Sequence, residues 1–160
     1  MHQNLLDDRG GNIAFSRAAL RQAQISGHYN QFQIQNNVQF TVDGVFGTLA
    51  PTDNQAFSTG HPTITGCNTV FYGIWVNNTN TIATTAGRIV DPATLGGAGG
   101  TAKTVIPFPD VVANNVLIGL LEVKVGVGAS FVPGTTNLNA SNVTATFFDT
   151  STMPSKPLQS

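Results

Sequence analysis

Charged side chains are scarce in this 160-residue chain. Lys, Arg, Asp and Glu make up 9% of the residues, seven basic and eight acidic, and the formal net charge is −1. An average globular protein has about 25% charged residues. The chain therefore lacks the broad basic surface that nucleic acid or anionic lipid requires. It also has little charge repulsion to keep its copies apart, which favours self-association.

Cysteine and long apolar stretches are scarce as well. Cys67 is the only cysteine, which excludes an internal disulfide. The longest strongly apolar stretch, residues 116–121, is far shorter than the roughly 20 residues that a membrane-spanning helix needs. Residues 1–8 lack the basic and apolar regions of a signal peptide. We therefore expect synthesis in a cytoplasm, with neither a membrane nor nucleic acid as partner.

The chain does have a long alternation of polar and apolar residues, from 31 to 43, interrupted only at Asn36. A period of two predicts β-structure with one buried face. No polar residue before Asp43 is charged, although solvated strands usually carry charges that prevent edge pairing. Such an uncharged face suits a surface that meets another protein. It consists of Gln31, Gln33, Gln35, Asn37, Gln39 and Thr41.

The alternation also limits how this segment pairs. It predicts one long strand, or a hairpin whose odd-length loop pairs Ile34 with Val38, because a one-residue register error would reverse every face. Asp43-Gly44 is the better tight turn, and it would place Val42 opposite Val45.

Several further strands are predicted, each bounded by turn signals such as residues 77–80 and Pro133-Gly134. They cover residues 69–76, 81–90, 112–127 and 143–147. Many short strands of this kind indicate an all-β fold, an antiparallel β-sandwich or barrel that is jelly-roll-like. We expect this domain to span residues 30–148, followed by an extended tail over residues 149–160.

Residues 1–29 are predicted to form an N-terminal arm with one short helix. Ser16 is a good N-cap for a helix over residues 17–25, and Phe15 and Leu20 occupy the positions of a hydrophobic staple. Gly27 supplies a C-terminal stop.

The strand predicted at residues 112–127 carries information about assembly. Its odd positions hold Leu or Val at 117, 121, 123, 125 and 127, which predicts a continuous core face. Its even positions change from apolar residues to Glu122 and Lys124 midway. The second face is therefore expected to be covered over its first half only. We expect that half, Val116, Ile118 and Leu120, to form the seam of an oligomer.

No arrangement of residues predicts catalysis, a metal or a cofactor. Residues 97–104 differ by one residue from a Walker A loop, with Ala102 at the second Gly position. Such a loop must open a helix, which Pro107 and Pro109 prevent here. The residues that could in principle bind zinc match no local ligand spacing: His28, His61 and Cys67. We therefore expect a protein without enzymatic activity.

Short phrases in the chain carry a resemblance to a known family. They are residues 56–61 (AFSTGH), 71–77 (FYGIWVN), 117–120 (LIGL), 131–138 (FVPGTTNL) and 144–154 (TATFFDTSTMP). Across most of residues 40–154 the chain resembles the small decoration or cement proteins of tailed-bacteriophage heads. The resemblance implies a β-rich, non-enzymatic virion protein, commonly a homotrimer, that binds major capsid proteins at the capsid surface and adds contact area to the shell.

The N-terminal arm is the segment that we expect to dock on the capsid. Its anchors would be Leu5, Leu6, Ile13, Phe15, Arg17, Leu20 and Arg21. The rival interpretation is a glycan-binding module on the virion surface or tail, in which Trp75 and Tyr72 stack on a sugar beside Asn-rich loops. A third interpretation, a tail or neck structural protein, differs from the first only in location.

Overall fold

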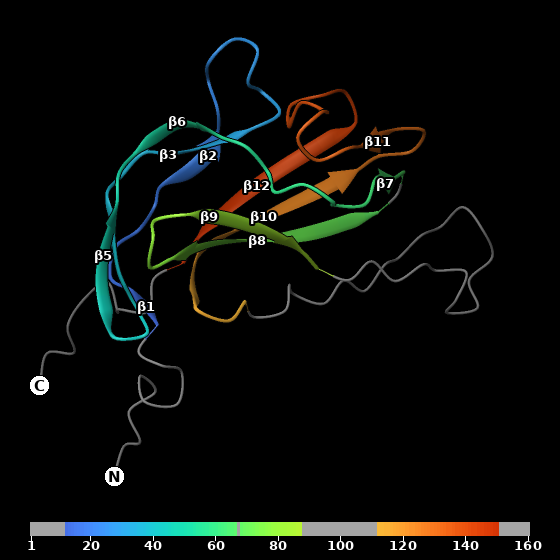
Figure 1. Ribbon diagram of the computed structural model, residues 1–160. Coiled ribbons are helices and arrows are strands. Elements are labelled where there is room, and N and C mark those ends of the chain that lie inside the picture. Colours follow the sequence, from blue (N-terminus) through green and yellow to red (C-terminus); the bar gives the residue numbers. More distant parts are fainter. Residues whose placement is uncertain (1–11, 67, 88–111, 151–160) are drawn as a thin grey trace, which may run out of the picture.

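The computed structural model describes residues 12–66, 68–87 and 112–150. Within these ranges every regular element is a β-strand, and the strand pairs are antiparallel. The prediction of an all-β, antiparallel fold, consistent with a β-sandwich, is therefore confirmed. Figure 1 shows the strands in two curved layers, one coloured blue to teal and the other green to red.

The first layer, which we call the bent sheet, is a three-stranded meander that changes direction in the middle. One half contains β1 (Ile13–Ala14), β4 (Val38–Val42) and β5 (Val45–Leu49), and the other contains β2 (Leu20–Gln22), β3 (Phe32–Ile34) and β6 (Thr52–Gln55). Ile13 pairs with Thr41 in the first half, and Leu20 pairs with Ile34 in the second. Seven residues separate these pairs on each strand (13 to 20 and 34 to 41), so the register continues across the bend.

The alternating segment supplies β3 and β4, and its break at Asn36 is where the bend lies. The backbone N–H of Asn36 and that of Gln35 both donate to the carbonyl of Ala18, at 3.2 and 3.0 Å. Of the two predicted alternatives, the hairpin that pairs Ile34 with Val38 does not occur, because Ile34 pairs with Leu20 and Thr52. The predicted buried face is confirmed, with side chains at most 1% exposed: Phe32, Ile34, Val38, Phe40 and Val42.

The predicted tight turn is confirmed as well. Val42 pairs with Val45, and Asp43 and Gly44 have φ angles of 52° and 76°. Positive φ at both central residues is the signature of a type I′ turn, whose twist matches that of a β-hairpin. The turn therefore fixes the register of β4 against β5.

The prediction of a helix over residues 17–25 is wrong. The segment contains β2, and Ala19 has a φ of 50°, which a right-handed helix does not allow. The hydroxyl of Ser16 does not cap a helix; it accepts from the N–H of Gln39 at 2.8 Å and donates to the carbonyl of Asn37 at 3.0 Å. Pairing with the alternating strand outweighs the local capping signals, because helix propensity is only a weak preference.

The second layer is a four-stranded sheet with the order β12-β10-β8-β9. Its strands are β8 (Thr69–Asn77), β9 (Ile82–Ala86), β10 (Asn115–Val125) and β12 (Val143–Asp149). These strands fall within or close to the predicted segments. The turn after β8 is held by the Asn77 side chain, whose Oδ1 accepts from the N–H groups of Thr79 and Thr81 at 3.0 and 2.9 Å.

A β-bulge in β10 moves its core face from even to odd positions. The register against β8 shifts between Leu117 and Gly119. Before the shift Val116 and Ile118 are buried, and after it the buried residues are Leu121, Val123 and Val125. The predicted odd-numbered core face is therefore correct only from Leu121 to Val125. Val127 is 78% exposed.

The two layers enclose one hydrophobic core and are joined along one side. The Nδ2 of Asn12, next to β1, donates to the carbonyl of Asn115 at 3.1 Å, and the N–H of Leu20 donates to Oδ1 of Asp149 at 2.9 Å. At the other end the short pair β7 (Ile64–Thr65) and β11 (Ser130–Phe131) adds Ile64 and Phe131 to the core.

Two finer predictions about the architecture differ from what is observed. A jelly roll is built from Greek keys, in which a fourth strand returns beside the first. No four described strands have this order: the bent sheet follows chain order, and in the four-stranded sheet β10 lies beside β8, with β9 on the other side of β8 and β12 beyond β10. The predicted boundary at residues 29 and 30 also falls inside the bent sheet, because β1 and β2 pair with β4 and β3.

Candidate interaction surface

The outer face of the first half of the bent sheet, on the side away from the core, is a surface of uncharged side chains. In its first half Ile13 pairs with Thr41, which pairs with Phe46, so these three side chains form one row across β1, β4 and β5. Gln39 and Thr48 form the next row, and Phe15 joins it because its N–H donates to the Gln39 carbonyl at 2.7 Å. We call these six residues the outer apolar face: three are apolar (Ile13, Phe15 and Phe46) and three are polar but uncharged (Gln39, Thr41 and Thr48).

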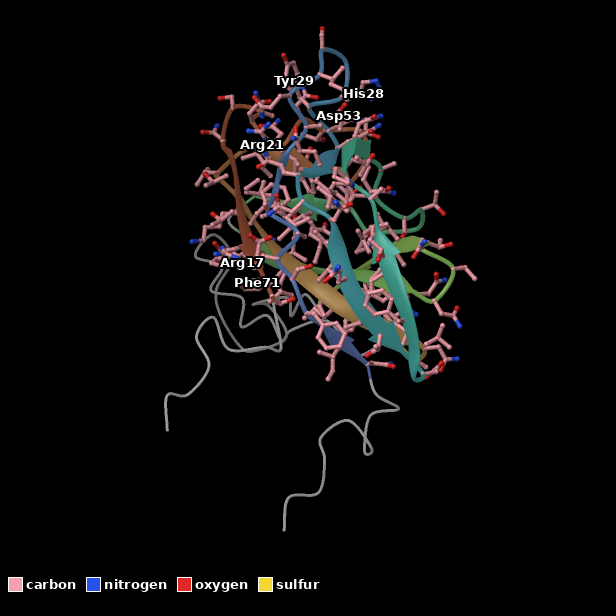
Figure 2. The ribbon with its side chains drawn as sticks, turned by 90° about the vertical axis from the view of Figure 1, so that its left-hand side faces the viewer. Arg17, Arg21, His28, Tyr29, Asp53 and Phe71 are labelled. Atoms are coloured by element: carbon pink, nitrogen blue, oxygen red, sulfur yellow. The ribbon has the colours of Figure 1, made fainter. Side chains whose placement is uncertain are left out.

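Charge is absent from the strands that carry this face. Neither β1, β4 nor β5 contains a Lys, Arg, Asp or Glu. Figure 2 views the molecule from this side, with Arg21 and Asp53 at the upper end and Arg17 at one margin. The strands in the lower half therefore present only uncharged side chains, and the cores of protein interfaces are likewise depleted of charge.

Large apolar side chains are exposed on and beside this face. Phe46 is 61% exposed, Val45 in the adjoining turn is 53% exposed, and Phe15 is 37% exposed. Clustered exposed apolar residues are unusual on a monomeric soluble protein and mark interaction sites. The neighbouring Gly47 lies over the ring of Phe40, since a Cβ at Gly47 would approach Cζ of that ring to 2.5 Å.

The predicted docking residues separate into different environments. Ile13 and Phe15 lie together on the outer apolar face, and Arg21 is exposed on β2. Arg17 pairs with Asp149 at 3.3 Å, with its side chain 73% exposed. Leu20 is a core residue, so its predicted role as a docking anchor is wrong. Leu5 and Leu6 lie outside the described residues.

The predicted oligomer seam is likewise divided. Val116 and Ile118 are 4% and 0% exposed and belong to the core of a single chain, so neither is available to a second subunit. The bulge explains the error, because it turns both even-numbered residues inward. Leu120, beyond the bulge, is half-buried and pairs with Phe148 and Gly73. Of the three residues predicted to form the oligomer seam, Leu120 is the one for which this role stays a prediction.

The aromatic residues that a glycan-binding module would use are buried. Trp75 is 5% exposed, and its Nε1 donates to the hydroxyl of Thr85 at 2.8 Å. Tyr72 is fully buried in the core. Neither ring presents a face on which a sugar could stack, so the version of the glycan-binding interpretation that uses Trp75 and Tyr72 is wrong.

His61 belongs to a cluster of aromatic rings between the layers. Its ring centroid lies 5.3 Å from that of Tyr72 and 6.4 Å from that of Phe57, both edge-to-face. Its Nε2 lies 2.8 Å from the hydroxyl of Thr84. Burial lowers the pKa of His61, because desolvation disfavours the imidazolium. The neutral ring therefore acts as part of the packing.

The described residues contain no group of three or more His, Cys, Asp or Glu side chains that could hold a metal ion. The Nδ1 of His28 lies 3.5 Å from the amide nitrogen of Asn54. Cys67 and the loop at residues 97–104 lie outside the described residues. No helix in the described part of the chain is long and apolar enough to cross a membrane.

The chain was compared with known protein families, curated proteins and solved structures. No protein family, curated protein or solved structure matches the chain.

Sequence reasoning missed Val45 and Phe46 as surface residues. The signal that could have identified them is the uncharged segment 45–49. It follows the Asp43-Gly44 turn directly, and the turn makes this segment pair with β4. Phe46 shares a row with Thr41 on the side of the sheet away from the core, and β5 has β4 on one side only, so the Phe46 side chain stays exposed.

Proposed function

We propose that the protein is a non-enzymatic structural component of a bacteriophage virion, a decoration or cement protein that binds across major capsid proteins at the capsid surface. The observation that carries the proposal is the charge-free outer apolar face, with Phe46 61% exposed and Phe15 beside it. Permanent interfaces have cores depleted of charge and enriched in aromatic residues. The resemblance to head decoration proteins supplies the class of partner.

The mechanism of this proposal is stabilisation by contact area. Obligate interfaces bury about 2,000 Å² or more, so many weak apolar and amide contacts add up to a strong attachment. Ile13 and Phe15 would supply the apolar contacts, and Gln39 and Thr41 would supply hydrogen bonds at the same surface. Leu5 and Leu6, which precede this strand in the sequence, would be further anchors. The protein would act as an oligomer, a homotrimer according to the resemblance, made in the host cytoplasm and located on the virion.

Co-sedimentation with capsid shells tests this function. The full chain is incubated with expanded shells of the phage that encodes it, and the bound fraction is measured over a range of concentrations. We expect saturable binding of the wild type and at least a tenfold weaker affinity for Phe15→Lys, because a buried interface would have to desolvate the new charge.

The matched control is Thr146→Lys, which adds the same charge at an exposed position of β12 on the other layer. It should bind like the wild type. The absence of wild-type binding to any shell would overturn the proposed function, and equal binding of Phe15→Lys would overturn the assignment of the contact to the outer apolar face.

A further inference from the structure

The outer edge of β5 is a sheet edge to which no described strand is paired. In the order β1-β4-β5 the strand has β4 on one side only. It contains Val45, Phe46, Gly47, Thr48 and Leu49, none of them charged. Natural edge strands usually carry Lys, Pro or a bulge that prevents pairing with another chain. β5 carries none of these.

Each of the other described edges has a hydrogen-bonded contact with a neighbouring segment or carries a charged residue. The β1–β2 edge is bonded to the four-stranded sheet through Asn115 and Asp149. The β9 edge is covered by Ser58, whose Oγ accepts from the N–H of Thr84 at 2.9 Å while its own N–H donates to the Thr84 hydroxyl at 2.9 Å. β6 continues the edge of β5 but carries the charged Asp53. Among the edges of the two main layers, β5 is therefore the one most open to a strand.

The turn that precedes β5 determines which backbone groups point outward. In a two-residue hairpin the residues that flank the turn form a hydrogen-bonded pair, and bonded and non-bonded pairs then alternate. Val42–Val45 and Phe40–Gly47 are thus bonded pairs within the hairpin. The N–H and C=O groups of Phe46 and Thr48 consequently point away from β4, toward the open edge.

We propose that the strand that pairs with this edge is β5 of a second copy of the chain, antiparallel and related by a two-fold axis at Gly47. In this register Phe46 of each copy lies opposite Thr48 of the other, so the outward N–H and C=O groups of both residues find their complements. A shift by two residues in either direction would leave one of these residues in each copy unpaired. The arrangement is isologous, as in most homodimers.

The side chains are compatible with this pairing. No like charges meet, because β5 has no charged residue and the whole chain has a formal net charge of −1. Gly47 would face its own counterpart without a steric obstacle, and Phe40 already fills the space beneath it. On the outer face the row of Ile13, Thr41 and Phe46 would continue into Thr48, Gln39 and Phe15 of the second copy. Two apolar faces would thereby become one.

The mass of the full chain in solution tests the pairing, and it does so independently of shell binding. Sedimentation velocity is measured over about a hundredfold range of concentration for the wild type, for Thr48→Lys and for the matched control Thr146→Lys. We expect a reversible monomer–dimer equilibrium for the wild type and the control. Thr48→Lys should raise the dimer dissociation constant at least tenfold, because two ammonium groups would lie across the seam.

Hydrogen exchange provides a second measurement that needs no variant. The amides of Phe46 and Thr48 should become protected as the wild-type concentration rises, whereas those of Val45 and Gly47, bonded within the hairpin, should be protected throughout. A wild type that stays monomeric, a trimer, or an association unchanged by Thr48→Lys would overturn the two-fold pairing. A trimer would agree with the homotrimer that the resemblance implies, so it would overturn the two-fold pairing and leave the proposed function standing. A dimer that fails to bind shells would overturn the proposed function alone.

Discussion

The carboxylate of Asp149 accepts a hydrogen bond of 2.9 Å from the backbone N–H of Leu20, 129 positions earlier in the chain. The same carboxylate pairs with Arg17 at 3.3 Å. One side chain thus joins the edge of the bent sheet to the edge of the four-stranded sheet. The connection closes a sheet edge and leaves β5, on the opposite side of the bent sheet, open.

The hydrogen bond to Leu20 should matter more than the ion pair. Asp149→Ala is expected to lower the free energy of unfolding by about 1–3 kcal/mol, because it leaves a buried N–H unsatisfied. Arg17→Ala should cost less than about 1 kcal/mol, since its side chain is 73% exposed. Urea unfolding of both variants checks the order. Equal losses in the two variants would mean that the ion pair carries the connection.

The close approach of Trp75 to Gly73 can be followed by fluorescence, because Trp75 is the only tryptophan. A Cβ at Gly73 would lie 2.5 Å from the indole Nε1, which donates to Thr85. Gly73→Ala should therefore displace the ring, shift its emission to longer wavelength and lower the free energy of unfolding by about 1–3 kcal/mol. Thr85→Val, which removes only the hydrogen-bond acceptor, should leave the emission closer to that of the wild type. An unchanged spectrum in Gly73→Ala would contradict the packing described for Trp75.

Protonation of His61 should make stability depend on pH. Its pKa is lowered in the folded protein by burial, whereas the unfolded chain has the ordinary value of about 6.5. Below pH 6.5 the unfolded chain binds more protons than the folded chain, so the free energy of unfolding falls as the pH falls toward the folded pKa. His61→Gln should remove this part of the slope. Urea unfolding between pH 7.5 and about 5 measures it; equal slopes in wild type and His61→Gln would contradict the prediction.

The hydroxyl of Tyr72 is buried and has no hydrogen-bond partner among the described residues. Burial also raises its pKa well above the ordinary value, so the phenol stays neutral. Because an unsatisfied buried hydroxyl is unfavourable, Tyr72→Phe should leave the free energy of unfolding unchanged or raise it by about 1–2 kcal/mol. Thermal or urea unfolding tests this. A loss of more than about 1 kcal/mol would show that the hydroxyl is bonded to a group such as an ordered water.

Periodic and turn signals in the sequence predicted much of the fold. The alternation from Phe32 to Val42 set the buried face, and Asp43-Gly44 set the hairpin, because both depend on neighbouring residues only. The helix prediction failed because the partner that makes residues 20–22 a strand is Ile34 and its neighbours, which no local pattern identifies. The bulge between Leu117 and Gly119 could not be predicted from the sequence either. A Cβ at Gly119 would meet Leu20 and the carbonyl of Phe148, both distant in sequence.

The candidate surface was predicted in part. The uncharged polar residues of the alternating segment indicated a contact face, and Ile13 and Phe15 do lie on the same side of the bent sheet. The most exposed aromatic residue of that side, Phe46, was missed because its exposure depends on where the sheet ends. Strand order is a property of the whole fold, and the sequence of a single strand does not reveal it.

The central claim is that the outer apolar face is the surface through which this protein attaches to a shell. A cryo-electron-microscopy reconstruction of capsids saturated with the full chain tests it most directly. We predict density for the bent sheet against the capsid, with Ile13, Phe15 and Phe46 inside the contact. A reconstruction in which that face points to solvent, with the four-stranded sheet against the capsid, would contradict the account.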